Sequence, residues 1–213
     1  MNDSTQSPRW RRRSEDRPAE IVAAAAEAFA LRGFSATRLE DIAALAGVSK
    51  GTLYRYFPNK EELFKAVVRR TLVPRIAEAE TLAAAADAPT PELLFGVLRK
   101  MVEMAATPVG AIPKMIIAEA GNFPDLARFY AEEVVARGFR LLAAILDRGA
   151  RRGDLRLVDA VSMAPVLMAP VLLVALWKNA VEAHAPFKLD IATFFEAYVD
   201  VMRRGLAPTA GED

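Results

Sequence analysis

Residues 42–64 read IAALAGVSKGTLYRYFPNKEELF, and the spacing of small, polar and apolar residues in them indicates a specific helical motif. Ala43 is small where two helices would nearly touch, Gly47 suits the positive φ of a tight turn, and Leu53 would lock the second helix onto the first. Ser49 is a residue type that commonly caps the first turn of a helix. The spacing of these four residues predicts a helix-turn-helix.

Helix boundaries around this motif are also marked in the sequence. Thr37 and Glu40 are spaced as a capping box at the start of the motif's first helix, and Asn59 and Glu62 repeat that spacing for the helix that follows the motif. The second helix of the motif is expected over residues 50–56, because Ser49 precedes it and a Phe-Pro pair follows it.

The rest of the chain shows helical periodicity and no alternating strand pattern. We predict an all-α fold of about nine helices, with an N-terminal three-helix unit that holds the helix-turn-helix and a C-terminal helical bundle that dimerises. The first helix is expected to begin at Pro18, a residue type suited to a first turn. The predicted divisions are a flexible basic arm over residues 1–17, a helix-turn-helix DNA-binding domain over 18–64, a ligand-binding and dimerisation domain over 65–207, and a tail over 208–213.

The composition narrows the chemistry that is available. The 213 residues include no cysteine and a single histidine, His184. Disulfides, thiolate metal sites and cysteine nucleophiles are therefore excluded, and the sequence contains no phosphate-binding glycine loop and no GxSxG motif. We expect neither an enzyme nor a cofactor. The polar, basic N-terminus does not resemble a secretory signal, and together with the lack of cysteine it indicates a cytoplasmic protein.

Charge is unevenly distributed along the chain. Residues 1–70 contain 13 Lys/Arg and 9 Asp/Glu, a net charge of +4, whereas residues 71–213 contain 15 and 18, a net charge of −3. A basic N-terminal part is expected of a protein that docks one end on phosphate. The arginines between Arg9 and Arg13 either belong to a solvated tail or form an arm that lies along DNA.

The second helix of the motif would expose hydroxyls, a lysine and tyrosines, which can bind base edges and phosphates. The DNA-binding candidates lie on this helix or at the starts of the flanking helices: Thr37, Ser49, Lys50, Gly51, Thr52, Tyr54, Arg55, Tyr56 and Lys60. The alternatives are packing for Tyr54 or Tyr56, a solvated charge for Arg55, and a capping role alone for Thr37.

The stretch from Ile21 to Phe64, above all residues 42–64, closely resembles the signature of the tetracycline-repressor (TetR/AcrR) family of transcriptional regulators. The resemblance implies a three-helix DNA-binding unit and a fourth helix that links it to a ligand-binding, dimerising bundle. It also implies base or backbone contacts for Ser49, Lys50, Gly51 and Thr52, and phosphate contacts for Tyr54, Tyr56 and Lys60. The segment from Ile116 to Leu126 is similar to one broad branch of the family, which does not share a single effector.

Methionine is concentrated in the C-terminal part, where six of the seven lie at or beyond position 101. Methionine adapts its shape, so a cavity lined by Met and aromatic side chains would suit a small apolar or amphipathic effector; ordinary core filling is the alternative. The ligand-binding candidates are Met101, Met104, Met115, Glu119, Phe123, Phe129, Tyr130, Met168 and Trp177. Glu119 either is buried and holds a polar ligand group or is exposed or salt-bridged.

The uncharged run over residues 160–177 only just reaches the length of a membrane span and contains two prolines. We predict a buried bundle helix or a subunit interface there, and no membrane partner. The last two helices, expected over residues 159–183 and 189–206, are apolar on more than one side and predict a homodimer. A two-fold dimer of helix-turn-helix units matches a palindromic operator in duplex DNA.

These features predict a ligand-responsive transcriptional regulator that an effector releases from its operator. Repression is the usual mode in the family that the chain resembles, and activation is the alternative mode. The rival interpretation is a helical small-molecule-binding protein that does not bind DNA. In the regulator, the helix after the motif would carry the coupling, since it enters the bundle around residues 72–76.

Overall fold

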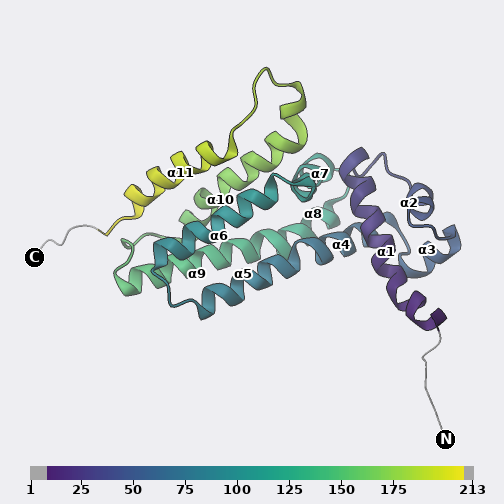
Figure 1. The fold of residues 1–213 in the computed structure, drawn as a ribbon, viewed down its shortest axis with the longest axis horizontal. Coiled ribbons are helices and arrows are strands. Elements are labelled where there is room, and N and C mark those ends of the chain that lie inside the picture. Colours follow the sequence, from purple (N-terminus) through teal and green to yellow (C-terminus); the bar gives the residue numbers. More distant parts are fainter. Residues whose placement is uncertain (1–8, 209–213) are drawn as a thin grey trace, which may run out of the picture. The chain divides into compact units, whose positions relative to one another are not determined.

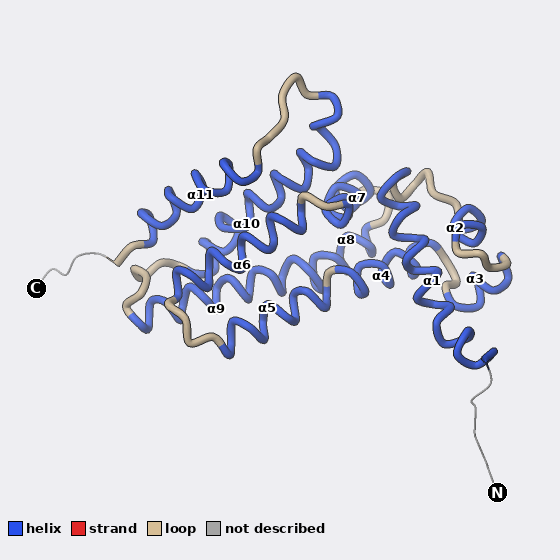
Figure 2. The backbone as a smooth tube through the Cα atoms, in the orientation of Figure 1, coloured by secondary structure: helices blue, strands red, loops and turns tan. Residues whose placement is uncertain are grey.

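The computed structural model describes residues 9–208, with side chains from residue 17 onward. These residues form helices and connecting loops, and no β-strand occurs among them (Figure 2). The predicted all-α class is therefore confirmed. The chain divides into two compact units between Arg70 and Thr71. We call residues 9–70 the head and residues 71–208 the bundle.

The head is built around three phenylalanine rings. Phe29, Phe34 and Phe64 are each at most 1% exposed, and their ring centroids lie 5.4–5.6 Å apart. Two of the three ring pairs meet edge to face, a favourable arrangement for aromatic side chains. The helices of this part of the chain are α1 (Arg9–Arg32), α2 (Leu39–Leu45), α3 (Lys50–Tyr56) and α4 (Lys60–Thr71).

The helix-turn-helix is formed by α2 and α3, as the sequence predicts. Gly47 has a φ of +63°, which a residue with a side chain adopts only at a cost. Ala43 is 4% exposed and Leu53 is fully buried, so the small residue and the locking residue both lie in the core of the head. Ser49 accepts a hydrogen bond from the backbone N–H of Thr52 and caps α3.

The N-terminal part of the chain differs from the prediction. Helix α1 begins at Arg9 and contains Pro18 in its interior, so residues 9–17 are helical rather than a flexible arm. Proline lacks an N–H donor and crowds the preceding turn, yet the helix runs through Pro18, and the arginines and glutamate before it have good helix propensity. Residues 1–8 of the predicted arm and 209–213 of the predicted tail lie outside the described residues.

The bundle contains the remaining helices (Figure 1). The predicted boundary between residues 64 and 65 falls inside α4, and Leu72 separates α4 from α5 just before Pro74. The elements of the bundle are α5 (Val73–Ala85), α6 (Thr90–Ala105), a 3-10 turn (Pro108–Gly110), α7 (Ala111–Glu119), α8 (Pro124–Tyr130), a π-helical turn (Ala131–Val135), α9 (Ala136–Arg152), α10 (Ala160–Leu176), a second π-helical turn (Trp177–Val181), a 3-10 turn (Glu182–His184) and α11 (Ile191–Leu206).

The core of the bundle lies where α6, α9 and α10 pack against one another, while α5 packs against α9 (Figure 1). Leu98 of α6, Leu142 of α9 and Leu167 of α10 are fully buried in this core. Helix α9 has one strongly apolar face, which its interior position explains. Helix α5 is therefore held by α9, whereas α6 packs against both α9 and α10.

Candidate nucleic-acid interface and ligand cavity

The N-terminus of α3 is fixed by local hydrogen bonds. The Oγ atom of Ser49 lies 3.1 Å from the backbone nitrogen of Thr52 and 2.9 Å from the Oγ1 atom of Thr52. Gly51 lies between them on the exposed side, and no heavy atom comes closer than 4.0 Å to the position that its Cβ would occupy. Another molecule can therefore approach the backbone of this turn closely, while its two hydroxyls remain available as donors or acceptors.

Lys50 carries a positive charge over this surface. Its Nζ atom lies 2.6 Å from the Oε1 atom of Glu40 on α2 and 5.7 Å from the centre of the Tyr54 ring. The hydrogen bond from Lys50 lowers the pKa of Glu40, and the same bond raises the pKa of Lys50. Both side chains are about half exposed or more, so solvent screens the pair, and a phosphate or base edge can replace Glu40 as the partner.

The other predicted residues of α3 extend this surface. Tyr54 is 41% exposed, Arg55 is exposed, and Tyr56 is half-buried. The structure thus brings six of the nine DNA-binding candidates together on one short exposed helix and its cap: Ser49, Lys50, Gly51, Thr52, Tyr54 and Arg55. Tyr56 stands at the C-terminal end of the same helix with its side chain partly covered.

Thr37 does not lie on this surface. Its side chain is 1% exposed, and its hydroxyl donates hydrogen bonds to the carbonyl oxygens of Gly33 at 2.6 Å and Ala28 at 3.3 Å. Arg38 takes the N-cap position of α2 without a side-chain bond, so the predicted capping box does not form. The hydroxyl satisfies carbonyls at the end of α1, which a helix terminus otherwise leaves unpaired.

Lys60 also points inward rather than toward a phosphate. Its Nζ atom donates to the carbonyl oxygens of Phe34, Ser35 and Thr37 at 2.8, 3.1 and 3.1 Å. It also lies 4.6 Å from the centre of the Phe34 ring. An ammonium group has three N–H donors, and these three carbonyls can take all of them. Lys60 therefore fixes the connection between α1 and α2 in this structure.

The bundle contains an apolar cavity of about 400 Å³. Four of the nine ligand-binding candidates line it: Met101, Met104, Tyr130 and Met168. Further lining residues, which the sequence did not single out, are Leu72, Ile76, Ala105, Val109, Gly110, Pro113, Ile116, Ile117, Ala127, Ala131, Val134, Val135, Gly138, Phe139, Val171, Leu172 and Ala175. A cavity of this size and polarity fits a small, largely apolar molecule.

Five candidates lie elsewhere, for reasons of helix geometry. On α7 the lining residues Pro113, Ile116 and Ile117 share one face, whereas Met115 and Glu119 are four residues apart on another face. Met115 is buried, and Glu119 is half-buried and accepts a hydrogen bond from Asn122.

The remaining three are aromatic residues next to the lining. Phe123 precedes α8, Phe129 is buried one position before Tyr130, and Trp177 follows Ala175 by two positions. Trp177 stacks on Phe187 with centroids 5.1 Å apart, and its buried Nε1 atom has no hydrogen-bond partner among the described residues. None of the three lines the cavity.

Tyr130 is the one lining residue with a polar side chain. Burial raises the pKa of its hydroxyl, so the group stays neutral at physiological pH. Within the described part of the chain its hydroxyl makes no hydrogen bond. Tyr130 can therefore offer one hydrogen bond to a molecule in an otherwise apolar cavity.

The outer sides of α10 and α11 expose apolar side chains. Val161, Leu173 and Val201 are 77%, 46% and 61% exposed, and a shallow hollow lies between the two helices. Within residues 9–208, the segment Ala160–His184 is long and apolar enough to cross a membrane, and 28% of its most apolar window is buried. Its inner side belongs to the bundle core, where Ala164 and Leu167 are buried, and its outer side forms an exposed apolar surface.

Two family models match the chain. Residues 21–67 match the model for bacterial regulatory proteins of the tetR family, and residues 94–187 match the model for the C-terminal domain of tetracyclin repressor-like proteins. The two matched segments together make up more than half of the sequence. The first contains the whole helix-turn-helix, and the second contains most of the residues that line the cavity.

Individual proteins agree with these models. The HTH-type transcriptional regulator RutR of Escherichia coli (strain K12) is 56% identical over 52 residues, 24% of either chain, so the match spans about a quarter of the length of this relative. The HTH-type transcriptional regulator YhgD of Bacillus subtilis (strain 168) is 29% identical over 191 residues, 87% of this chain and 96% of that protein. A solved structure from Mesorhizobium loti MAFF303099, assigned to TetR-family transcriptional regulators, has a TM-score of 0.73 and 26% identity, and the match covers 92% of this chain and 98% of that one.

Proposed function

Because the chain belongs to the tetR family of bacterial regulatory proteins, we propose that it represses transcription as a homodimer on a palindromic operator. A small, largely apolar or amphipathic effector releases it from the duplex. The observation that carries this proposal is the exposed, serine-capped helix α3 with Lys50 and Tyr54 on its surface. This function requires the protein to be in the cytoplasm, where bacterial DNA is accessible.

Operator binding is proposed to use α3 in the major groove, as in other helix-turn-helix proteins. Lys50 exchanges Glu40 for a base edge or phosphate, and Ser49 and Thr52 offer hydroxyls at the helix N-terminus. Tyr54 and Arg55 reach phosphates along the groove edge. Lys50 must leave Glu40 to bind DNA. Only a partner that binds Lys50 more strongly than this exposed carboxylate does can displace it.

Dimerisation is proposed to cover the apolar outer sides of α10 and α11 with the same helices of a second copy. We expect Leu173→Glu combined with Val201→Glu to convert the dimer to a monomer in light scattering. Leu157→Glu is the matched control, since Leu157 is 87% exposed but lies in the loop between α9 and α10. A double variant that remains dimeric would place the interface elsewhere.

Effector binding is proposed to occur in the cavity of about 400 Å³, with Tyr130 as the single donor. The lining includes Leu72 and Ile76, which follow α4 directly in the chain. An effector that contacts these residues can therefore favour one orientation of α4 over another. The coupling needs a difference in affinity between the two states, which in such systems is about 1–3 kcal/mol.

The experiment that tests the proposal begins with selection of bound sequences from random duplexes. The recovered duplex is then titrated by fluorescence anisotropy at several salt concentrations. We expect a palindrome, a steep loss of affinity with salt, and loss of binding in the variant Lys50→Ala with Tyr54→Ala. Lys100→Ala, an exposed lysine on α6, is the control and should bind as the unmodified protein does.

Two results would contradict the proposal. If the double variant bound the duplex as tightly as the control, α3 would not be the recognition helix. If no duplex were enriched at all while an apolar ligand bound the bundle, the chain would be a helical small-molecule-binding protein without DNA binding.

A further inference from the structure

A groove of about 720 Å³ runs between α5 and α6 on the surface of the bundle. Its floor is apolar and includes Ala79, Leu93 and Val97. Its rim is charged, with Arg75 and Glu78 on α5 and Glu92, Lys100 and Glu103 on α6. Neither side of the groove depends on the head, since every lining residue lies between Arg75 and Thr107.

The groove and the internal cavity share three lining residues, which are Ile76, Met101 and Met104. These three side chains therefore form a partition between the two hollows. We propose that the effector enters the cavity through this groove, and that Met101 and Met104 form the gate. The proposal rests on the effector site proposed above. It assigns the two methionines a role in admitting the effector to the cavity, in addition to contacting it there.

Methionine suits a gate that opens without a change of backbone. Its side chain is unbranched, with three rotatable bonds, so it can swing aside at little cost in rotamer energy. Met101 and Met104 are both half-buried, with one side toward the cavity and the other toward the groove. They are three residues apart on α6 and so lie next to each other on the same face.

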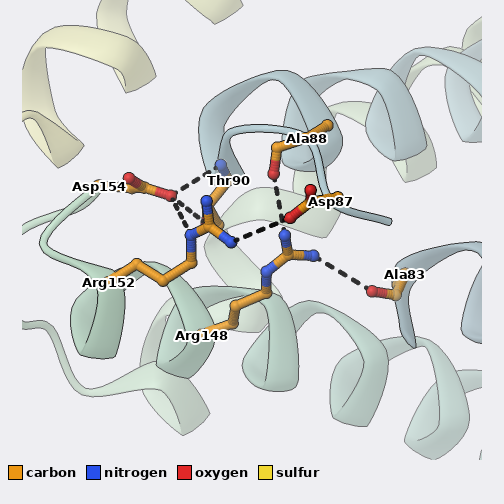
Figure 3. A network of polar contacts seen from close by, with 7 residues as sticks. All are labelled: Ala83, Asp87, Ala88, Thr90, Arg148, Arg152 and Asp154. Carbon is orange, nitrogen blue, oxygen red and sulfur yellow. Dashed lines mark hydrogen bonds and ion pairs between the residues drawn. The ribbon is translucent and has the colours of Figure 1, made fainter. Parts of the chain in front are cut away.

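Polar contacts from α9 hold α5 along its second half and the loop that follows it. Arg137 of α9 binds Glu80 of α5 at 2.6 Å. Arg148 of α9 donates to the carbonyl oxygens of Ala83 at 3.3 Å and Ala88 at 2.9 Å, at the end of α5 and in the loop to α6 (Figure 3).

The start of α6 is held from the same side. Asp154 accepts hydrogen bonds from the backbone nitrogen and the hydroxyl of Thr90 at 3.0 and 2.7 Å, and Arg152 binds Asp154 at 3.0 Å (Figure 3). This network fixes the closed end of the α5–α6 hairpin against the end of α9. These contacts hold the loop end of the hairpin, and the Arg137–Glu80 pair holds the middle of α5, so we propose that the gate opens by side-chain movement.

The gate selects ligands by their shape. A molecule that passes between two methionine side chains, with the helix backbone unmoved, must present a slim apolar body. The rim carries charges of both signs, so a polar end group can stay at the rim. An amphipathic molecule can therefore enter with its apolar end first. We therefore expect flat or chain-like apolar molecules to bind quickly and bulky, branched ones to bind slowly.

A second opening exists and provides the comparison. The cavity also reaches the surface beside Ile117 of α7 and Leu172 of α10, which are 57% and 40% exposed. The side chain of isoleucine is branched at Cβ and stiff, unlike that of methionine. The two routes can be blocked separately, because the natural chain contains no cysteine and a single introduced thiol is labelled uniquely.

The test uses Gly96→Cys in the full-length protein, labelled with a polyethylene glycol maleimide. Gly96 lines the groove but not the cavity, and a Cβ built there meets no heavy atom within 4 Å. Ile117→Cys with the same label is the matched control at the other opening. Binding of the apolar fluorophore N-phenyl-1-naphthylamine is followed by stopped-flow fluorescence, which gives both rate constants.

We expect the label at position 96 to slow association and dissociation at least tenfold and to leave the equilibrium constant within twofold, while the label at position 117 changes neither rate. Met104→Ile should also slow both rates several-fold, whereas Met115→Ile, buried but outside the lining, should not. The proposal is overturned if only the label at 117 slows binding, or if the label at 96 weakens the equilibrium without slowing association. A fluorophore that does not bind the unmodified protein would instead count against the effector site itself.

Discussion

Replacing Lys60 with methionine tests whether this lysine supports the head or binds a phosphate. The substitution removes three hydrogen bonds to the connection between α1 and α2. The bonds to the carbonyls of Phe34 and Thr37 are partly buried, and the bond to Ser35 is exposed. Counting about 1 kcal/mol for each partly buried bond, and nothing for the exposed one, gives a loss of about 2 kcal/mol.

Hydrogen exchange measured by mass spectrometry can assign this loss to the head. A loss of about 2 kcal/mol corresponds to roughly 30-fold faster exchange in amides that exchange by opening of the head, while peptides from α9 and α10 should be unaffected. Lys50→Met is the control, because Lys50 forms only an exposed ion pair with Glu40 and its loss should leave exchange nearly unchanged. Methionine keeps the length of the lysine stem in both variants.

The DNA-binding measurement separates the two roles. A lysine that contacts phosphate lowers the slope of log affinity against log salt by about one when it is removed. We expect that change for Lys50→Met and not for Lys60→Met when both proteins are folded. The contrary result is that Lys60→Met leaves hydrogen exchange in the head unchanged and lowers the slope of log affinity against log salt. That result would refute the role of Lys60 in holding the α1–α2 connection and would support the phosphate contact that the family resemblance implies.

Three further predictions follow from the structure. Gly47→Ala should destabilise the head by about 1–2 kcal/mol in urea unfolding, because position 47 has a φ of +63°; an unchanged midpoint would contradict the need for glycine at this turn. Thr37→Val should also destabilise the head while the salt slope of DNA binding stays the same, and a change in that slope would return Thr37 to the DNA interface. Burial raises the pKa of Tyr130 and of Tyr198, so above about pH 10 the unfolded chain loses protons that the folded chain retains. Stability should therefore fall as the pH rises above that value, and the fall should be shallower in Tyr130→Phe with Tyr198→Phe.

The head could be predicted well from sequence where the signal is local. Ala43, Gly47, Ser49 and Leu53 act through their own helix or the next one, so their spacing alone located the turn and the cap. Thr37 is a residue whose contacts could not be predicted from the local sequence. It has the spacing of a capping residue, but its hydroxyl binds the end of α1, a tertiary partner that the capping pattern does not include.

Lys60 and the cavity residues show that sequence patterns also fail to predict contacts between residues far apart in the chain. Lys60 begins α4, which suggested a phosphate site, yet its partners lie 23 to 26 residues earlier in the chain. Met101 and Met168 line the cavity and Met115 does not, although all three were selected for the same reason, the concentration of methionine in the C-terminal part. Which methionines face inward depends on how α7 and α10 are rotated against α6 and α9, and periodicity identifies an apolar face without saying what that face meets.

The ring cluster of Phe29, Phe34 and Phe64 has a consequence for how such proteins arise and how they can be rebuilt. All three rings belong to the head, so their contacts with one another do not depend on the sequence of the bundle. A gene fusion near the codon for Leu72 would join this head to a different ligand-binding bundle. The match to RutR, 56% identity over 52 residues, is likewise limited to about a quarter of each chain.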